Sequence, residues 1–286
     1  MSTSIDQSFV RQYEMEVHHV FQTKGGFLRN TVRLKTDVKG ESTTFQKVGQ
    51  GKATSKARHG VITPMNQSHD PIVCTLTDRY AGDWVDKLDE AKVNHDERAV
   101  IVLGGAWAIG RTVDSDIFTA LDATTQAPVP WTATSVVAIR NSLISITEAL
   151  DANKVPNDGQ RYIALTARAW AQAETVEQFS SSDFVDASGR PFVEGSPFPM
   201  FRRWHGALWM NHQELPNAGQ AGAKGFAWHK TAVGYAIGAD MTADITWHGD
   251  RAAHFVNHMF SGGACLIDDL GVIEISLADD VALPTT

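Results

Sequence analysis

The sequence has 286 residues, of which 43% are hydrophobic and 20% are charged, and its net charge is −8. This composition predicts a folded chain with one large or two modest cores and excludes wholesale disorder. No apolar run reaches the roughly 18 residues that a membrane helix needs, so no membrane partner is expected, and the polar, acidic N-terminus is unlike a secretory signal.

The first third of the chain is predicted to be an arm followed by a long ribbon. Residues 1–24 have apolar side chains at roughly helical spacing, and a Gly-Gly pair ends that pattern. Apolar and basic residues then alternate over 27–35, 39–41 form a turn, and 43–48 return as a second strand before a loose tip. An isolated two-stranded ribbon is marginal in water, so this one is expected to pack outside its own domain.

Positive charge is concentrated in the same region. Residues 24–58 carry nine Lys or Arg and two acidic residues, a net charge of +7, whereas the rest of the chain carries −15. A cationic segment on an anionic body is expected to be attracted to the body of another copy. Contact with nucleic-acid phosphates is the alternative, which the scarcity of aromatic residues and the lack of a known reader motif disfavour.

Three helices are predicted next along the chain. Asp78 is a candidate N-cap for the first, which extends to about Leu88. The second runs from Asp96 to about Leu121. The third, 135–152, is the clearest, because its apolar residues recur at alternating spacings of three and four.

The second half mixes short strands and helices without a regular βαβ repeat. Helices are predicted over 167–179 and 230–238, with a helical turn within 250–260, and 180–225 are predicted to be loops and short strands. Further strands are predicted over 161–166, 225–229, 245–247, 264–267 and 271–276. This intermixing favours the α+β class.

Few patterns favour catalysis or cofactor binding. The glycines at 104, 105 and 110 follow an apolar run but fit no GxGxxG register, so they predict close helix packing instead. Neither a P-loop nor a GxSxG nucleophile elbow occurs in the sequence. We therefore expect no enzymatic activity, no catalytic residues and no cofactor.

His248, His254 and His258 are the candidate metal ligands. On a helix, His254 and His258 would share one face as two zinc ligands do, but no HExxH glutamate lies between them. Ordinary packing is the favoured interpretation, and a metal-dependent enzyme is the alternative. Cys74 and Cys265 are expected to be buried free thiols of a reducing compartment, with a disulfide or a metal pair as the alternative.

Residues 21–121 contain a series of short motifs. They are Leu-Arg-x-x-Val opening a hairpin, Phe-x-x-x-Gly before its return, then Arg-His, Thr-Pro, and two predicted helices that begin Arg-Tyr and Asp-x-Arg. The residues that form these motifs are Leu28, Arg29, Val32, Phe45, Gly49, Arg58, His59, Thr63, Pro64, Arg79, Tyr80, Val85, Asp86, Asp96, Arg98 and Ala106. In this pattern the segment resembles the major capsid proteins of tailed double-stranded-DNA bacteriophages. A weaker likeness extends to Ser182-Asp183-Phe184, and the C-terminal part matches in general layout.

The resemblance implies the Hong Kong-97-type capsid fold. Residues 1–27 would form an N-terminal arm and 28–75 an extended β-hairpin loop. Residues 76–129 and 263–286 would form a peripheral domain with a long spine helix, and 130–262 an axial domain. The extended loop would contact the adjacent subunit through Arg29, Arg33, Lys35, Lys39, Lys47, Lys52, Lys56 and Arg58.

The resemblance also implies a function and its partners. The chain would self-assemble, as hexamers and pentamers, into the icosahedral head shell that encloses the phage genome. Its partners would be other copies of itself, scaffolding, portal and cement proteins, and packaged double-stranded DNA held by non-specific contact. It would lie in the host cytoplasm before assembly and in the virion afterwards. The alternatives are a nucleic-acid-binding protein that uses the basic segment 24–58, and a cellular encapsulating shell protein with the same fold.

Overall fold

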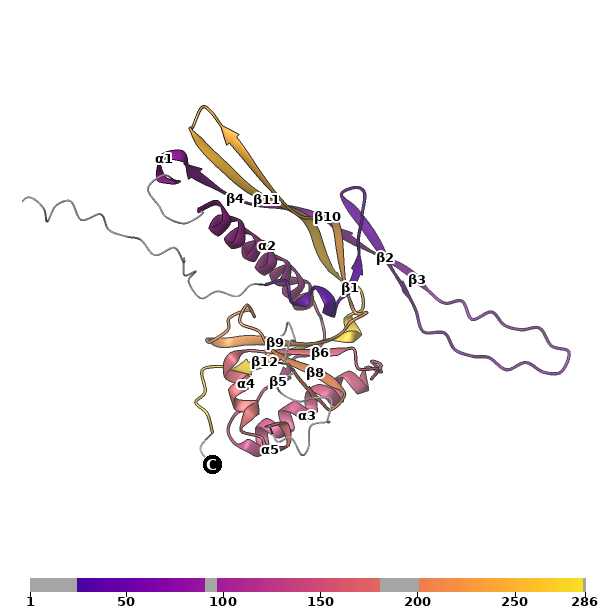
Figure 1. The fold of residues 1–286 in the computed structure, drawn as a ribbon. Coiled ribbons are helices and arrows are strands. Elements are labelled where there is room, and N and C mark those ends of the chain that lie inside the picture. The colour runs from indigo at the N-terminus through magenta and orange to yellow at the C-terminus, as the bar shows by residue number, and fades with distance from the viewer. Residues whose placement is uncertain (1–24, 91–96, 181–200, 285–286) are drawn as a thin grey trace, which may run out of the picture.

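The computed structural model describes residues 25–90, 97–180 and 201–284. It contains a six-stranded sheet with helices, a four-stranded sheet with one long helix, and a two-stranded ribbon that projects sideways from the body (Figure 1). This mixture of helices and sheets confirms the predicted α+β class. Within the described ranges, no helix is both long enough and apolar enough to cross a membrane.

The six-stranded sheet carries helices that lie below it in Figure 1. In spatial order its strands are β5 (Val129–Pro130), β12 (Val272–Ala278), β9 (Ala221–His229), β6 (Arg161–Leu165), β8 (Ala207–Asn211) and β7 (Phe201–Trp204). The helices are α3 (Val136–Ala152), α4 (Ala167–Glu174) and α5 (Glu177–Ser180). The predicted strand over 161–166 and the helices over 135–152 and 167–179 are thus confirmed, the last as two short helices.

Helix α3 shows why this layer forms. Its N-cap is Ser135, whose hydroxyl accepts a hydrogen bond from the Ala138 amide at 3.2 Å. The apolar stripe that predicted the helix faces the sheet, and Ile139, Leu143 and Ile146 are fully buried there. This layer therefore has a continuous core of its own.

The four-stranded sheet lies against one long helix. Its strands in order are β1 (Arg33–Lys35), β10 (Val233–His248), β11 (Ala253–Leu266) and β4 (Thr77–Asp86), and the helix is α2 (Glu97–Asp122). A second core joins α2 to both sheets, with Ile117 from the helix, Tyr235 from β10 and Trp228 from β9 all fully buried. The predicted helix over 96–121 is confirmed as α2.

Three predicted helices are wrong, because the residues form long strands. The windows 78–88, 230–238 and 250–260 lie mainly in β4, β10 and β11, and only α1 (Lys87–Glu90) is helical at the end of the first. Strands β10 and β11 pair along their length, and β11 pairs with β4 from Ala253↔Asp86 to Gly262↔Thr77. Short apolar spacings fit either structure, and here the pairing with distant strands decides.

The ribbon is also paired differently from the prediction. Strand β1 pairs in parallel with β10, whereas β2 (Ser42–Val48) pairs with β3 (His69–Thr75). Residues before β1 form a short 3-10 helix, η2 (Leu28–Thr31), instead of a strand. Leu28 and Thr31, three positions apart in this turn, are both buried, and the Thr31 hydroxyl donates to the Leu28 carbonyl at 2.7 Å.

The second half of the chain is divided between the two sheets at other positions than the expected domain boundaries at 130 and 262. Strands β10 and β11, expected in the second unit, belong to the four-stranded sheet because they hydrogen-bond to β1 and β4. Strand β12, expected in the first unit, pairs with β9 and β5 in the six-stranded sheet. Pairing with strands that are distant in the sequence therefore decides to which sheet these three strands belong.

Candidate assembly surface

The ribbon has almost no core of its own. In β2 and β3 only Phe45 and Cys74 are buried, and both lie near the root of the ribbon. Residues 49–68 extend beyond the paired strands to the tip, where Val61 is 92% exposed and Ile62 69% exposed (Figure 1). A ribbon of this kind gains little stability from its own contacts, as the sequence predicts.

The root of the ribbon packs tightly on the body. Phe45 contacts a small buried cluster that includes Ala236 and Ile267. A Cβ added at Gly234 would lie 2.8 Å from the Phe45 ring, so the ring rests directly on the backbone of β10. The paired part of the ribbon thus packs on the body, whereas residues 49–68 extend beyond it.

Half of the predicted contact residues interact within the subunit. Arg29 forms an ion pair with Asp240 at 2.9 Å, and Lys47 forms one with Asp268 at 2.9 Å. The charged groups of Arg33 and Lys35 lie 5.7 and 6.0 Å from the centre of the Phe45 ring. These four residues therefore help to hold the root of the ribbon on its own subunit.

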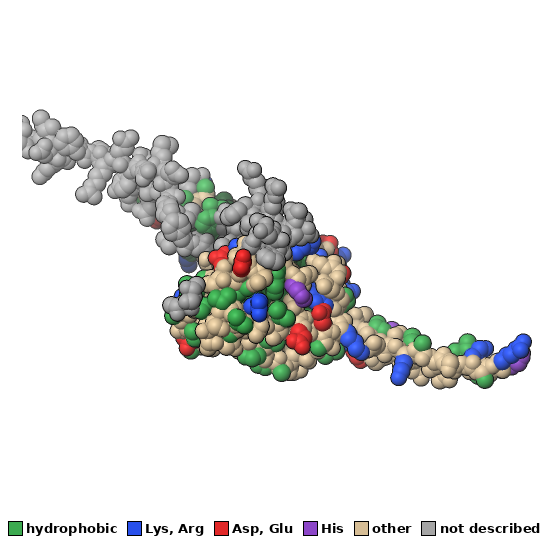
Figure 2. Space-filling view, turned by 90° about the horizontal axis from the view of Figure 1, so that it is seen from below, with side chains coloured by type: hydrophobic (Ala, Val, Ile, Leu, Met, Phe, Trp, Pro, Cys, Tyr) green, Lys and Arg blue, Asp and Glu red, His purple; other side chains and the backbone are tan. Residues whose placement is uncertain are grey.

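The other four predicted contact residues are exposed to solvent. Lys39 is exposed near the root, and Lys52, Lys56 and Arg58 are exposed in the tip. The Lys56 ammonium donates to the Gly60 carbonyl at 3.4 Å, which is a local contact. Residues 42–69 contain no Asp or Glu. Figure 2 accordingly shows basic and hydrophobic side chains along the outer part of the ribbon.

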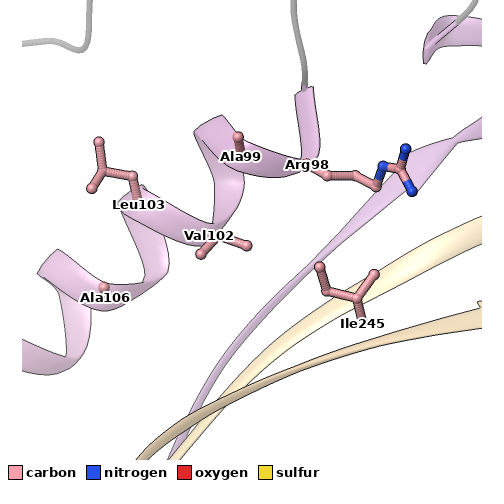
Figure 3. A pocket seen from close by; sticks show the side chains of 6 residues that line it. All are labelled: Arg98, Ala99, Val102, Leu103, Ala106 and Ile245. Atoms are coloured by element: carbon pink, nitrogen blue, oxygen red, sulfur yellow. The ribbon is translucent and has the colours of Figure 1, made fainter.

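An apolar groove lies between the first turns of α2 and strand β10. It has a volume of about 560 Å³ and is lined by Arg98, Ala99, Val102, Leu103, Ala106 and Ile245. Figure 3 shows the Ile245 side chain pointing from the strand toward the helix, with Arg98 at the end of the groove. Leu103 is 43% exposed and Ile245 is 47% exposed, so their apolar atoms are open to a partner.

A buried carboxylate fixes the chain where it enters the body. Asp114 of α2 is fully buried and accepts hydrogen bonds from the amides of Phe27 and Leu28, at 3.3 and 3.1 Å. Its Oδ2 lies 3.4 Å from Nε2 of His212, the residue after β8. Since His212 Nδ1 accepts from the Glu214 amide at 3.2 Å, Nε2 carries the proton that points at Asp114.

This junction was missed by reasoning from the sequence. His212 belongs to no motif of the sequence, and Asp114 is one of several acidic residues in α2. An acid among the buried apolar positions of a helix was the available signal, because such a group needs partners.

The candidate metal ligands lie on strands instead of a helix. His258 is buried on β11, with Nδ1 3.3 Å from the Ala81 carbonyl oxygen. A Cβ at Gly105 would collide with this imidazole, which confirms the predicted close packing at that glycine. His254 packs on Trp247 with ring centres 4.9 Å apart. Within the residues that the structure describes, no three His, Cys, Asp or Glu side chains are grouped as metal ligands.

Some sequence features lie outside the described residues. They are the helical spacing over 1–24 and the likeness at Ser182-Asp183-Phe184.

The fold is similar to those of several phage capsids. The capsid of cyanophage P-SCSP1u is 17% identical, with 97% of this chain and 95% of that chain covered and a TM-score of 0.74. Mycobacterium phage Che8 is 16% identical, with coverage of 98% and 100% and a TM-score of 0.71. The capsid of a native GTA particle is 12% identical, with coverage of 96% and 97% and a TM-score of 0.68.

The sequence comparison identifies the family. No curated protein sequence matches the chain. A family model described as phage capsid protein matches residues 5–279, which is nearly the whole chain. The observed fold is the Hong Kong-97-type fold that the resemblance implied. The chain belongs to the phage capsid protein family and is a structural, shell-forming major capsid protein of the tailed-phage type.

Proposed function

We propose that the shell is held together by the ribbon of each subunit, which lies across the four-stranded sheet of the next. The observation that carries this proposal is the ribbon itself, which is buried at its root and exposed at its apolar tip. Burial of a side chain such as Val61 or Ile62 gains roughly 1.5–3 kcal/mol. Contacts of this size, repeated around a closed shell, add to a stable assembly.

The groove of Figure 3 is the proposed receiving surface for the tip of a second copy. Its lining is mostly aliphatic, which suits Val61, Ile62 and Met65 of the tip. The overall charges favour the same pairing, because the tip contains Lys and Arg but no Asp or Glu, while the chain outside 24–58 carries −15. The exposed Asp244, beside Ile245, is the acid nearest to that residue along the chain.

The fold suggests a role for each part of the shell subunit. In this proposal 1–27 form the arm, and 28–75 form the extended loop except for β1, which joins the four-stranded sheet. That sheet with α2 is the peripheral domain, and the six-stranded sheet with its helices is the axial domain. Axial domains would meet as hexamers and pentamers. Scaffolding, portal and cement proteins and non-specifically held double-stranded DNA complete the proposed partners, with the host cytoplasm as the place of assembly and no catalytic role.

Electron microscopy of the purified full chain tests the proposal. Wild-type protein should form closed particles, and the double variant Val61→Ser with Ile62→Ser should remain unassembled while it stays folded by circular dichroism. Leu103→Glu in the groove should have the same effect. Val137→Ser is the matched control, because Val137 is 56% exposed on α3, away from the groove. Particles of normal yield from both tip and groove variants would refute the ribbon contact.

DNA binding as the main function is less well supported than the sequence alone implied. Arg29 and Lys47 are neutralised by ion pairs within the subunit, which reduces the charge left for phosphates. A salt titration of duplex DNA binding by the unassembled chain measures the remainder. Nuclease-protected DNA inside particles would separate a phage shell from a cellular encapsulating shell, whose cargo would be protein.

A further inference from the structure

The two cysteines of the chain meet at the root of the ribbon. Cys74 lies one residue from the end of β3, and Cys265 lies one residue from the end of β11, far away in sequence. Both belong to the cluster formed around Phe45, in which Cys74 is 1% exposed and Cys265 is partly exposed. The two strands cross closely here, since a Cβ added at Gly263 would collide with the Thr75 carbonyl oxygen.

The two thiols lie in one small cluster at the crossing of β3 and β11. Cys74 Sγ lies 3.3 Å from the Gly263 carbonyl oxygen, to which its S–H donates. Interaction with the Cys265 side chain lowers the pKa of Cys74, while the same interaction and burial raise the pKa of Cys265. A thiolate is the form that reacts with oxidants, so Cys74 is the more reactive of the pair.

We propose that Cys74 and Cys265 form a reversible disulfide within one subunit when the protein meets a peroxide, and that this bond fastens the ribbon to strand β11. The inference is independent of the proposed ribbon contact between subunits, because it concerns one chain. The partly exposed Cys265 provides the route by which a small peroxide reaches the pair.

The chemistry needs only the two thiols and hydrogen peroxide. The Cys74 thiolate attacks one peroxide oxygen, the O–O bond breaks, and the leaving hydroxide takes a proton to become water, which leaves a sulfenic acid. The Cys265 sulfur then attacks the Cys74 sulfur, the S–S bond forms, and the sulfenic oxygen leaves as a second water with the Cys265 proton. Two thiols lose two electrons and two protons, the peroxide gains them, and an added thiol reverses the reaction.

The disulfide is expected to link β3 covalently to β11 at the root of the ribbon. In the reduced protein the root is held by packing of Phe45 and by the Lys47–Asp268 ion pair. The disulfide would close a loop through most of the chain and remove the freedom of β3 to separate from β11. Oxidised protein should therefore unfold at a higher temperature than reduced protein.

Peptide mapping of the full chain tests the site. The protein is treated with hydrogen peroxide, free thiols are blocked with iodoacetamide, and the chain is digested without reductant. We expect a peptide pair that joins Cys74 to Cys265, loss of both thiols together, and recovery of both after dithiothreitol. Recovery of both cysteines as separately alkylated or separately oxidised residues would overturn the proposal.

Two comparisons make the test specific. Cys265→Ala and Cys74→Ser should each abolish the linked peptide and the peroxide-dependent rise in melting temperature; Cys265→Ala replaces a partly exposed residue, so it is the safer variant for folding. A non-reducing gel should show a monomer band. A peroxide-dependent dimer band would contradict a bond within one subunit.

Discussion

The six-stranded layer and the ribbon differ in how much of their apolar surface is buried within the subunit. The layer buries large side chains of α3, α4, α5 and the sheet against one another. The centre of the Phe179 ring, for example, lies 5.6–5.8 Å from the ring centres of Trp170, Trp204 and Trp209. The ribbon buries Phe45 and Cys74 at its root and exposes Val61 and Ile62 at its tip. The layer therefore contributes a large core to the stability of the subunit, whereas the tip of the ribbon contributes little to it.

The largest expected effect comes from removing the tip. Val48 and His69 are paired opposite each other, so an Asn-Gly turn can replace residues 49–68 and close β2 onto β3. We expect the shortened protein to keep its free energy of unfolding in urea within about 0.5 kcal/mol and to form no particles by electron microscopy. Particles from this variant would show that the tip is not needed for assembly. Loss of the folded subunit would show that the tip is needed for folding.

The next largest effect concerns the core of the layer. Phe179→Ala should lower the free energy of unfolding by about 3–5 kcal/mol, because it leaves a cavity among three tryptophans. Val61→Ala in the ribbon should change it by no more than about 0.5 kcal/mol. Denaturant titrations of the unassembled chain measure both. Equal losses at the two positions would show that the tip packs on its own subunit.

Asp114 of α2 joins the chain at Phe27 and Leu28 to His212 after β8, and it tests how the segment before β1 is anchored. Asp114→Ala leaves the buried Leu28 amide and His212 Nε2 without their acceptor, which should cost about 1–3 kcal/mol of unfolding free energy. Asp114→Asn keeps one acceptor oxygen and should cost less. If alanine and asparagine were equally harmless in urea titrations, the carboxylate would have no anchoring role.

A fourth prediction concerns acid stability at the edge of the layer. Burial raises the pKa of Asp269, but hydrogen bonds from Thr125, Gln126 and Thr124 outweigh it and hold the pKa at about 2, below the ordinary 3.8. A lowered pKa stabilises the fold above about pH 4, and this contribution is lost as the pH falls from about 4 to about 2. Its size is about 1–2 kcal/mol after allowance for partial exposure.

Asp269→Asn supplies the control for that prediction. In unfolding experiments from about pH 2 to about pH 5, the unfolding free energy of the variant should depend less steeply on pH than that of wild type. A wild-type curve with the same slope as the variant would contradict the stabilised carboxylate.

The smallest effect is expected at the exposed ion pair of the ribbon's base. Arg29 and Asp240 lie at 2.9 Å with side chains 33% and 61% exposed. Arg29→Ala should therefore cost only about 0–1 kcal/mol, and less in high salt. A larger loss would mean that Arg29 anchors the segment before β1 through more than its charge.

Local patterns were enough to predict several parts of the molecule. The stripe of α3, the long helix α2 and the short strand β6 are encoded by neighbouring residues, so their periodicity shows in the sequence. The excess of basic residues over 24–58 likewise predicted a cationic ribbon with a loose tip and little core of its own. These features needed no knowledge of distant residues.

Tertiary structure decided what depends on distant partners. Strands β4, β10 and β11 have spacings that suit a helix, and only their mutual pairing makes them a sheet. The same holds for the ion pairs that bind Arg29 and Lys47 within the subunit, for the Asp114–His212 junction, and for the meeting of Cys74 with Cys265. Each joins residues far apart in the chain, and no local pattern records which distant group a side chain will meet.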